Sequence, residues 1–136
     1  LMIPQFELLT EEARAILPDS IPFEDGVFNI GRASLLVASI IDGSMENLSI
    51  AMDDRMHQPY RKNLIPDDDY IIDRAMQSGA KGVFLSGAGP IIIAIVDDRD
   101  RSSFEENMKG ELAELAEVWT LKWAKLNNEG IKTTIY

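Results

Sequence analysis

Two arginines and a histidine are the first residues in this sequence whose types could do chemistry. Arg61 ends an irregular segment, DRMHQPYR (54–61), that breaks helical periodicity between predicted helices and carries the only histidine of the chain. Such segments often hold binding groups. A guanidinium offers a planar fork for a carboxylate or a phosphate, although a surface salt bridge explains Arg61 equally well from sequence alone. Arg14, on a predicted helix, is more simply interpreted as a solvated arginine paired with a nearby glutamate.

Two further features could suggest catalysis, but each has a simpler explanation. His57 could be a general base, yet a lone histidine without an evident partner is more often a hydrogen-bonded structural residue. The run Asp67, Asp68 and Asp69 could be taken for a metal cluster. Its position favours the acidic first turn of a helix over residues 70–78, where negative charge suits the helix dipole.

A glycine-rich hinge is the third candidate, and the stretch around it organises the rest of the chain. The segment GVFLSGAGPIIIAIV (82–96) contains two short apolar runs rich in β-branched residues, separated by residues 86–90. This pattern predicts a β-hairpin. Small loop residues allow backbone N–H groups to approach an anion or another backbone, which a Cβ would block. An ordinary turn explains the spacing as well, and the loop lacks the lysine of a phosphate-binding P-loop.

The remaining pattern predicts strands near both ends and helices between them. We expect strands over 1–9, 118–125 and 131–136, with a turn at 127–130. We expect helices over 10–17 with Thr10 as N-cap, 22–41 ended by Gly43, 45–54 capped by Ser44, 70–78 closed by Gly79, and from 102 or 103 to about 116. The 22–41 helix has apolar residues on more than one face, which predicts a mostly buried central helix. Together these elements predict an α+β fold with an antiparallel sheet covered by helices on one side.

Length and composition limit the class of protein. The chain has 136 residues, 46% apolar and 26% charged, which predicts one soluble globular domain over 1–136. It has no cysteine, so disulfides and thiolate metal sites are excluded. Without a long apolar run or a signal-like start we expect a cytoplasmic protein rather than a membrane or exported one. The net charge of −10 argues against binding to nucleic acid or to anionic membranes.

Four stretches, in order, carry a resemblance to a known family. They are IPQFELLTEEARAILP (3–18), FNIGRASLLVASIIDG (28–43), DDRMHQPYR (53–61) and GVFLSGAGPIIIAIV (82–96). They resemble the C-terminal half of the homoserine kinases, a branch of the GHMP small-molecule kinases, over about residues 3–130. The combination of TEEAR with HQPYR separates this branch from the mevalonate and galactose branches. The resemblance implies the GHMP C-terminal domain, which is ferredoxin-like.

The resemblance also implies an activity and a set of site residues. Enzymes of this family convert ATP and L-homoserine to ADP and O-phospho-L-homoserine, with Mg²⁺, in threonine biosynthesis. By resemblance, Arg14 and Arg61 hold the amino-acid substrate, most plausibly by its carboxylate. The matching glycine loop lies beside the substrate and supports the phosphate-binding loop of the other domain. The loop residues are Ser86, Gly87, Ala88 and Gly89, with Gly87 at the substrate, and the supporting residues behind the arginines are His57, Gln58 and Tyr60.

The sequence departs from the family in one large respect. The PxxxGLGSSA-type phosphate loop, the metal-binding carboxylate and the adenine pocket of the family's N-terminal half have no counterpart here. We therefore expect ATP and Mg²⁺ to belong to the full-length enzyme, and this chain alone to bind neither and to be inactive. The expected partners are L-homoserine and the missing N-terminal domain, and a homodimer is left open. The alternatives are another GHMP kinase, or a stand-alone α+β amino-acid-binding or regulatory module. An exposed apolar face would count against the module.

Overall fold

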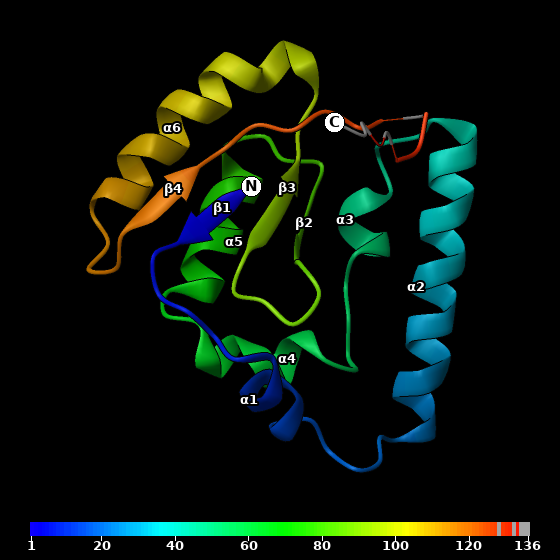
Figure 1. Ribbon diagram of the computed structural model, residues 1–136. Helices are drawn as coiled ribbons and strands as arrows, with labels where there is room; N and C mark the ends of the chain where they lie inside the picture. The colour runs from blue at the N-terminus through cyan, green and yellow to red at the C-terminus, as the bar shows by residue number, and fades with distance from the viewer. Residues whose placement is uncertain (128, 132, 134–136) are drawn as a thin grey trace.

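The chain folds as a four-stranded antiparallel sheet with helices (Figure 1). The structure is a computed structural model, and it describes residues 1–127, 129–131 and 133. The strands are β1 (Met2–Pro4), β2 (Gly82–Leu85), β3 (Ile92–Ile95) and β4 (Trp119–Leu121). The helices are α1 (Thr10–Ala15), α2 (Phe23–Asp42), α3 (Leu48–Ala51), α4 (Gln58–Arg61), α5 (Asp68–Gln77) and α6 (Arg101–Ala113), with 3-10 turns η1 (Lys62–Leu64) and η2 (Asp98–Asp100). The strand order β2-β3-β1-β4 confirms the predicted α+β class and matches a split βαβ arrangement.

The predicted hairpin is present and lies at one edge of the sheet. Strands β2 and β3 pair in antiparallel register from Gly82 opposite Ile95 to Leu85 opposite Ile92. Gly82 has a packing role, because a Cβ at that position would fall 2.5 Å from the sulfur of Met52. The glycine therefore lets the residue after α3 lie directly against β2.

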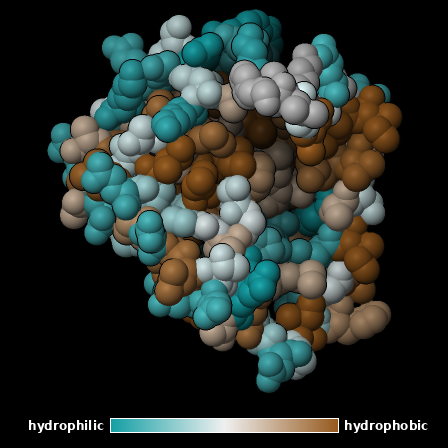
Figure 2. Space-filling view, in the orientation of Figure 1, coloured by the Kyte–Doolittle hydropathy of each residue, from teal (hydrophilic) through white to brown (hydrophobic). Residues whose placement is uncertain are grey.

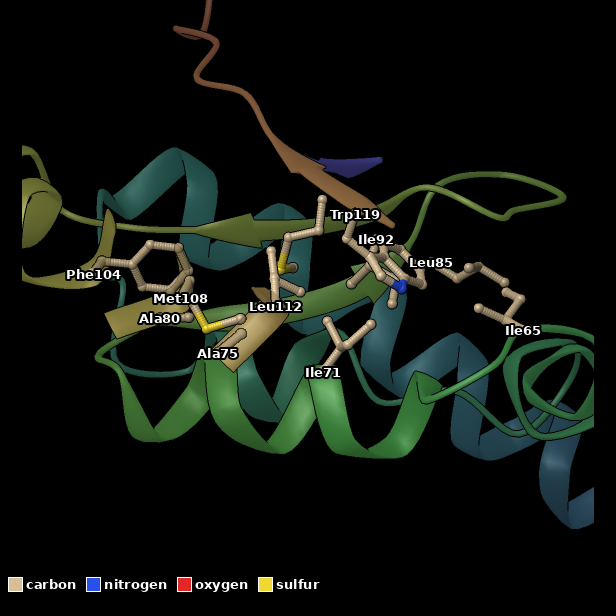
Figure 3. Close-up of a cluster of buried hydrophobic side chains, with 11 residues drawn as sticks. Ile65, Ile71, Ala75, Ala80, Leu85, Ile92, Phe104, Met108, Leu112 and Trp119 are labelled. Carbon is tan, nitrogen blue, oxygen red and sulfur yellow. The ribbon is translucent and has the colours of Figure 1, made fainter. Parts of the chain in front are cut away.

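Helices α5 and α6 cover one face of the sheet and form the core with it (Figure 3). Residues four apart on each helix face the strands, which is the spacing of one helical face. The fully buried large side chains are Met2, Ile71, Ile92, Phe104 and Met108. This core holds the hairpin and β1 in place, and its position on one side of the sheet agrees with the prediction.

The first strand and its following helix differ from the prediction at their boundary. Strand β1 ends at Pro4 rather than continuing to Leu9. Phe6 turns back instead and packs edge-on against Trp119, with ring centroids 6.2 Å apart. Thr10 is the first residue of α1 and not its cap, since the N-cap position is Leu9, which makes no side-chain capping bond.

Several predicted helices have different limits. The expected 45–54 helix is reduced to α3, four residues long with Asn47 rather than Ser44 at its N-cap. The segment 54–61 is not wholly irregular, because it ends in α4. Helix α5 begins two residues earlier than predicted, with Asp67 at its N-cap, and α6 ends three residues before 116.

The C-terminal strand pair is only partly seen. Strand β4 has three residues rather than the eight predicted over 118–125. Ile131 and Thr133 are not in a strand, and the rest of the predicted 131–136 strand lies outside the described residues. The turn before it has the expected chemistry, since the Asn127 side-chain amide donates to the Gly130 carbonyl at 2.7 Å.

Helix α2 has the predicted length but not the predicted environment. It runs from Phe23 to Asp42 and ends at Gly43, which takes the left-handed conformation at φ 71°. Ser39 is its only buried residue, so the expectation of a mostly buried helix is wrong. In Figure 1 α2 stands apart from the sheet, and in Figure 2 brown apolar side chains gather along the same edge. Among the described helices, α2 included, none has the length and apolarity needed to cross a membrane.

Candidate functional site

Arg61 lies where α1, α4 and the hairpin loop meet. The side chain is 9% exposed. Its Nε donates to the Ala13 carbonyl and its Nη1 to the Gly87 carbonyl, each at 2.9 Å. Pro59 in the first turn fixes the start of the short α4 helix that carries it. The Arg61 guanidinium therefore joins the glycine loop to α1, where its acceptor Ala13 is 48 residues from Arg61 along the chain.

His57 is a neighbour of this guanidinium. Its Nδ1 lies 3.3 Å from Arg61 Nη1. Because a guanidinium can only donate, Nδ1 accepts and the ring proton is on Nε2, which lies 3.9 Å from Asp54 Oδ1. This geometry fits a supporting role better than that of a general base, and the role stays a prediction.

Asp54 organises the start of α4, and sequence reasoning gave it no role. Its Oδ2 accepts the backbone N–H groups of His57 at 2.8 Å and Gln58 at 2.6 Å, and its Oδ1 accepts from the Asn29 amide. Burial acts to raise the pKa of Asp54, but these hydrogen bonds and the nearby His57 hold it below its usual range. Asp54 lies three residues before the N-cap residue His57, so the usual pattern of a capping aspartate did not mark it in the sequence.

Gln58 and Tyr60, the other predicted supporting residues, differ in their contacts. Gln58 Oε1 accepts the Leu85 N–H at 2.8 Å, and Nε2 donates to the Met52 carbonyl at 3.2 Å. Gln58 thus joins α4 to the end of β2, where the glycine loop begins. Tyr60 is half-buried, and its hydroxyl makes no hydrogen bond to a described residue.

The glycine loop is a closed turn. The Ser86 N–H donates to the Ile91 carbonyl and the Gly89 N–H donates to the Ser86 carbonyl, so two of its amides are used internally. Within the described chain, the N–H groups of Gly87 and Ala88 have no acceptor. Gly87 and Gly89 both have positive φ, 57° and 89°. The loop therefore needs glycine at these positions for its own backbone.

The two glycines differ in the space around them. A Cβ at Gly87 would meet nothing within 4 Å. A Cβ at Gly89 would lie 3.1 Å from Ile65 Cδ1 and 3.2 Å from Leu85 Cδ1. At Gly89 the requirement for a small residue comes from the core of this chain, in addition to any approach by another domain.

Arg14 is exposed on α1, beside the residue whose carbonyl Arg61 binds. Among the described residues it makes no hydrogen bond or ion pair, so the expected pairing with a nearby glutamate is not seen. Its guanidinium is available to a ligand. Convergence of the two arginine side chains on one substrate stays a prediction.

A cleft of about 500 Å³ lies between α2, α3, α4 and α5 and borders the site, since Asp54 and Gln58 line it, although neither Arg14 nor Arg61 does. Asp68 and Asp69 are on its wall. Burial, and then the charge of Asp69, raise the pKa of Asp68 to about 6. Both residues lie in the first turn of α5, as predicted for the acidic run. Over residues 1–127, 129–131 and 133, no group of three histidines or carboxylates could hold a metal ion.

Comparison with known proteins identifies the family. The profile described as GHMP kinases C terminal matches residues 36–114. A homoserine kinase of Caldicellulosiruptor saccharolyticus is 52% identical over 130 residues, which are 94% of this chain and 42% of that protein. One of Clostridium novyi is 43% identical over 129 residues, 95% of this chain and 43% of that protein.

A solved structure agrees with these relatives. The crystal structure of homoserine kinase from Cytophaga hutchinsonii matches with a TM-score of 0.80 and 28% identity, over 88% of this chain and 38% of that one. The chain therefore spans about two fifths of the length of the relatives it matches. Its fold and its sequence both place it in the GHMP kinases, where it corresponds to the C-terminal domain.

Proposed function

We propose that this chain is the C-terminal, substrate-binding part of an ATP-dependent homoserine kinase, which phosphorylates the hydroxyl of L-homoserine and supplies threonine biosynthesis. The observation that carries the proposal is the 52% identity to a homoserine kinase over 94% of the chain. The contact of Arg61 with the glycine loop supports it, because it joins two of the stretches in which the resemblance lies.

The two arginines would share the work unequally. Homoserine is a small zwitterion, and a guanidinium fork recognises a carboxylate better than an ammonium does. Arg14 has its whole fork available. Arg61 already donates from Nε and Nη1 to the carbonyls of Ala13 and Gly87, so Nη2 is the nitrogen it would offer to a ligand. We therefore assign the carboxylate chiefly to Arg14, with Arg61 supplying fixed positive charge and holding the loop.

ATP and Mg²⁺ would be bound mainly by the part of the enzyme outside this chain. The described residues hold no carboxylate cluster that fits a metal ion, and two of the loop amides are already hydrogen-bonded. Phosphoryl transfer depends on positioning and on charge stabilisation around the phosphates. This chain would contribute the positioning of the alcohol substrate. We place the enzyme in the cytoplasm, for which the absence of cysteine is suitable.

The test is a chimera in which this chain replaces the matched residues of the Caldicellulosiruptor saccharolyticus enzyme. We expect ATP-dependent phosphorylation of homoserine, and no calorimetric ATP binding by the 136-residue chain alone. Removing one partner of a desolvated charge pair costs about 2 kcal/mol or more. Because each 1.36 kcal/mol is about tenfold in rate, Arg14→Ala should lower kcat/KM for homoserine by roughly 30-fold. Arg14→Lys should recover only part of the loss, since the charge returns without the fork.

Arg99→Ala is the matched control. Arg99 is also an exposed arginine, but it lies on η2, far from α1 in sequence. Its partner is the neighbouring Asp97. Its removal should leave kcat/KM unchanged. A folded chimera that prefers another alcohol would reassign the substrate within the family. Equal kinetics for the Arg14→Lys variant and the unsubstituted chimera would remove the carboxylate role.

A further inference from the structure

Helix α2 carries its apolar face outward. The residues of this face are spaced 4-3-4-3-4 along the helix and are called here the α2 seam. They are Phe23, Val27, Ile30, Ser34, Val37 and Ile41. The five apolar members are 52% to 89% exposed. A helix that stays at the surface normally turns such a stripe toward the core.

The opposite face of α2 is turned toward the protein, and it mixes polar residues with the half-buried Phe28, Leu35 and Leu36. Ser39 is buried there, and neither its hydroxyl nor Arg32 Nε has a hydrogen-bond partner among the described residues. Arg32 and Arg55 lie on the ring of Phe28, at 4.3 and 3.9 Å from its centroid. Polar, stacking and half-buried apolar contacts therefore hold α2 to the described chain, while the described residues leave the apolar residues of the seam more than half exposed.

The spacing of the seam indicates what covers it. Apolar residues alternating three and four apart are the pattern by which two helices pack lengthwise. Ser34 interrupts the apolar residues, but its hydroxyl donates to the Ile30 carbonyl at 2.8 Å. It thus presents a small side chain without an unsatisfied donor, where a partner helix can approach closely. From residue 23 to 41 the seam is about 27 Å long, at 1.5 Å per residue.

We propose that the seam is the docking site for one helix of the remainder of the kinase, the more than half of the relatives' length that has no counterpart here. Helix α2 is joined to the candidate site through its inner face, because Asn29 donates to Asp54, which holds the segment carrying Arg61. Figure 1 shows the start of α2 at the same end of the molecule as α1 and α4. The proposal rests on the part of the proposed function that makes this chain one domain of a larger kinase, and not on the identity of the alcohol.

Photocrosslinking in the chimera tests the occupant directly. A benzophenone amino acid replaces Phe23 or Ile41, one at a time, and mass spectrometry locates the linked residues. We expect both positions to link within one polypeptide to a single helix of the added part, at sites about 18 residues apart. Links between two copies of the chimera would make the seam a dimer interface and overturn the proposal. Links to separate segments, or none, would also overturn it.

A matched pair of substitutions tests burial. Val27 and Val118 are both valines, 52% and 54% exposed, but Val118 directly precedes β4, and β4 lies on the other side of the molecule from α2 (Figure 1). Val27→Glu should lower the chimera's Tm by roughly 4–10 °C, and Val118→Glu by less than about 1 °C. Equal shifts would contradict the proposal. If Val27→Glu does not fold, Val27→Thr should give a smaller shift in the same direction, and no shift would contradict it.

Neither readout depends on turnover. A chimera that phosphorylates no homoserine but shows the expected crosslinks would retain the docking site and refute the proposed function. A chimera that phosphorylates homoserine without those crosslinks would support the proposed function and refute the docking site.

Discussion

Replacing Arg61 with alanine should destabilise the fold as well as weaken substrate binding. The guanidinium makes two hydrogen bonds of 2.9 Å to backbone carbonyls and lies near His57, at 9% exposure. A hydrogen bond to a charged group contributes about 1.5–3 kcal/mol. The two are not additive, since water can reach the carbonyls once the side chain is gone. We expect Arg61→Ala to lower the free energy of unfolding by about 3 kcal/mol.

The assay is urea unfolding of the 136-residue chain, followed by far-ultraviolet circular dichroism. The matched control is Arg14→Ala, because Arg14 is exposed and makes no bond to a described residue. It should change the free energy of unfolding by less than about 0.5 kcal/mol. Arg61→Lys should recover about a third of the loss, because an ammonium cannot reach both carbonyls at once. If Arg61→Ala and Arg14→Ala proved equally stable, the loop would not depend on the Arg61 contacts.

Four more substitutions test the environment of single residues. The folded-state pKa of Asp68, about 6, exceeds that of an unfolded carboxyl, so the wild type loses stability as pH rises from about 4 to 6. Asp68→Asn should therefore be more stable than wild type by up to about 2 kcal/mol in urea unfolding at pH 7.5, with no gain at pH 4. Gly89→Ala should lower the free energy of unfolding by about 2–3 kcal/mol and Gly87→Ala by about 1 kcal/mol. Both glycines have positive φ, but only Gly89 is crowded by neighbouring side chains. Equal losses of stability in urea unfolding would contradict this. Gln58→Ala should speed hydrogen exchange at the Leu85 amide, whose acceptor it removes, and unchanged exchange would mean that the bond is dispensable.

The features best predicted from the sequence are those that depend on residues close together along the chain. The hairpin, the glycine that ends α2 and the acidic start of α5 all follow from local patterns. The environment of α2 could not be predicted in this way. Its apolar residues indicate that something covers the helix, and periodicity does not say whether the cover belongs to the same chain.

The candidate site shows the same limit. Arg61 and the glycine loop were candidates from residue type and spacing, the resemblance placed both at the substrate, and they meet in the structure. Asn29 and Asp54 were given no role, because their pairing joins residues 25 apart on separate elements and no local pattern marks it. The same reasoning treated Arg14 and Arg61 as equivalent. The structure separates them, because only Arg61 has its donors engaged by backbone carbonyls.

The contacts of α2 predict which part of the isolated chain is least stable. Its inner face is attached by polar pairs such as Asn29 with Asp54, which contribute about 1 kcal/mol each, and by apolar residues that are only half-buried and belong to no part of the main core. Each large side chain of the outer face would contribute about 1.5–3 kcal/mol once buried. Because the most exposed apolar side chains of α2 are on the seam, burial of the seam by a partner would strengthen the attachment of α2. In native-state hydrogen exchange of the 136-residue chain, α2 amides should exchange at least tenfold faster than those of α5, which packs on the core through Ile71 and Ala75. Protection of α2 equal to that of α5 would show that the contacts of the inner face suffice, and the exposed seam would then need no partner to keep the helix in place.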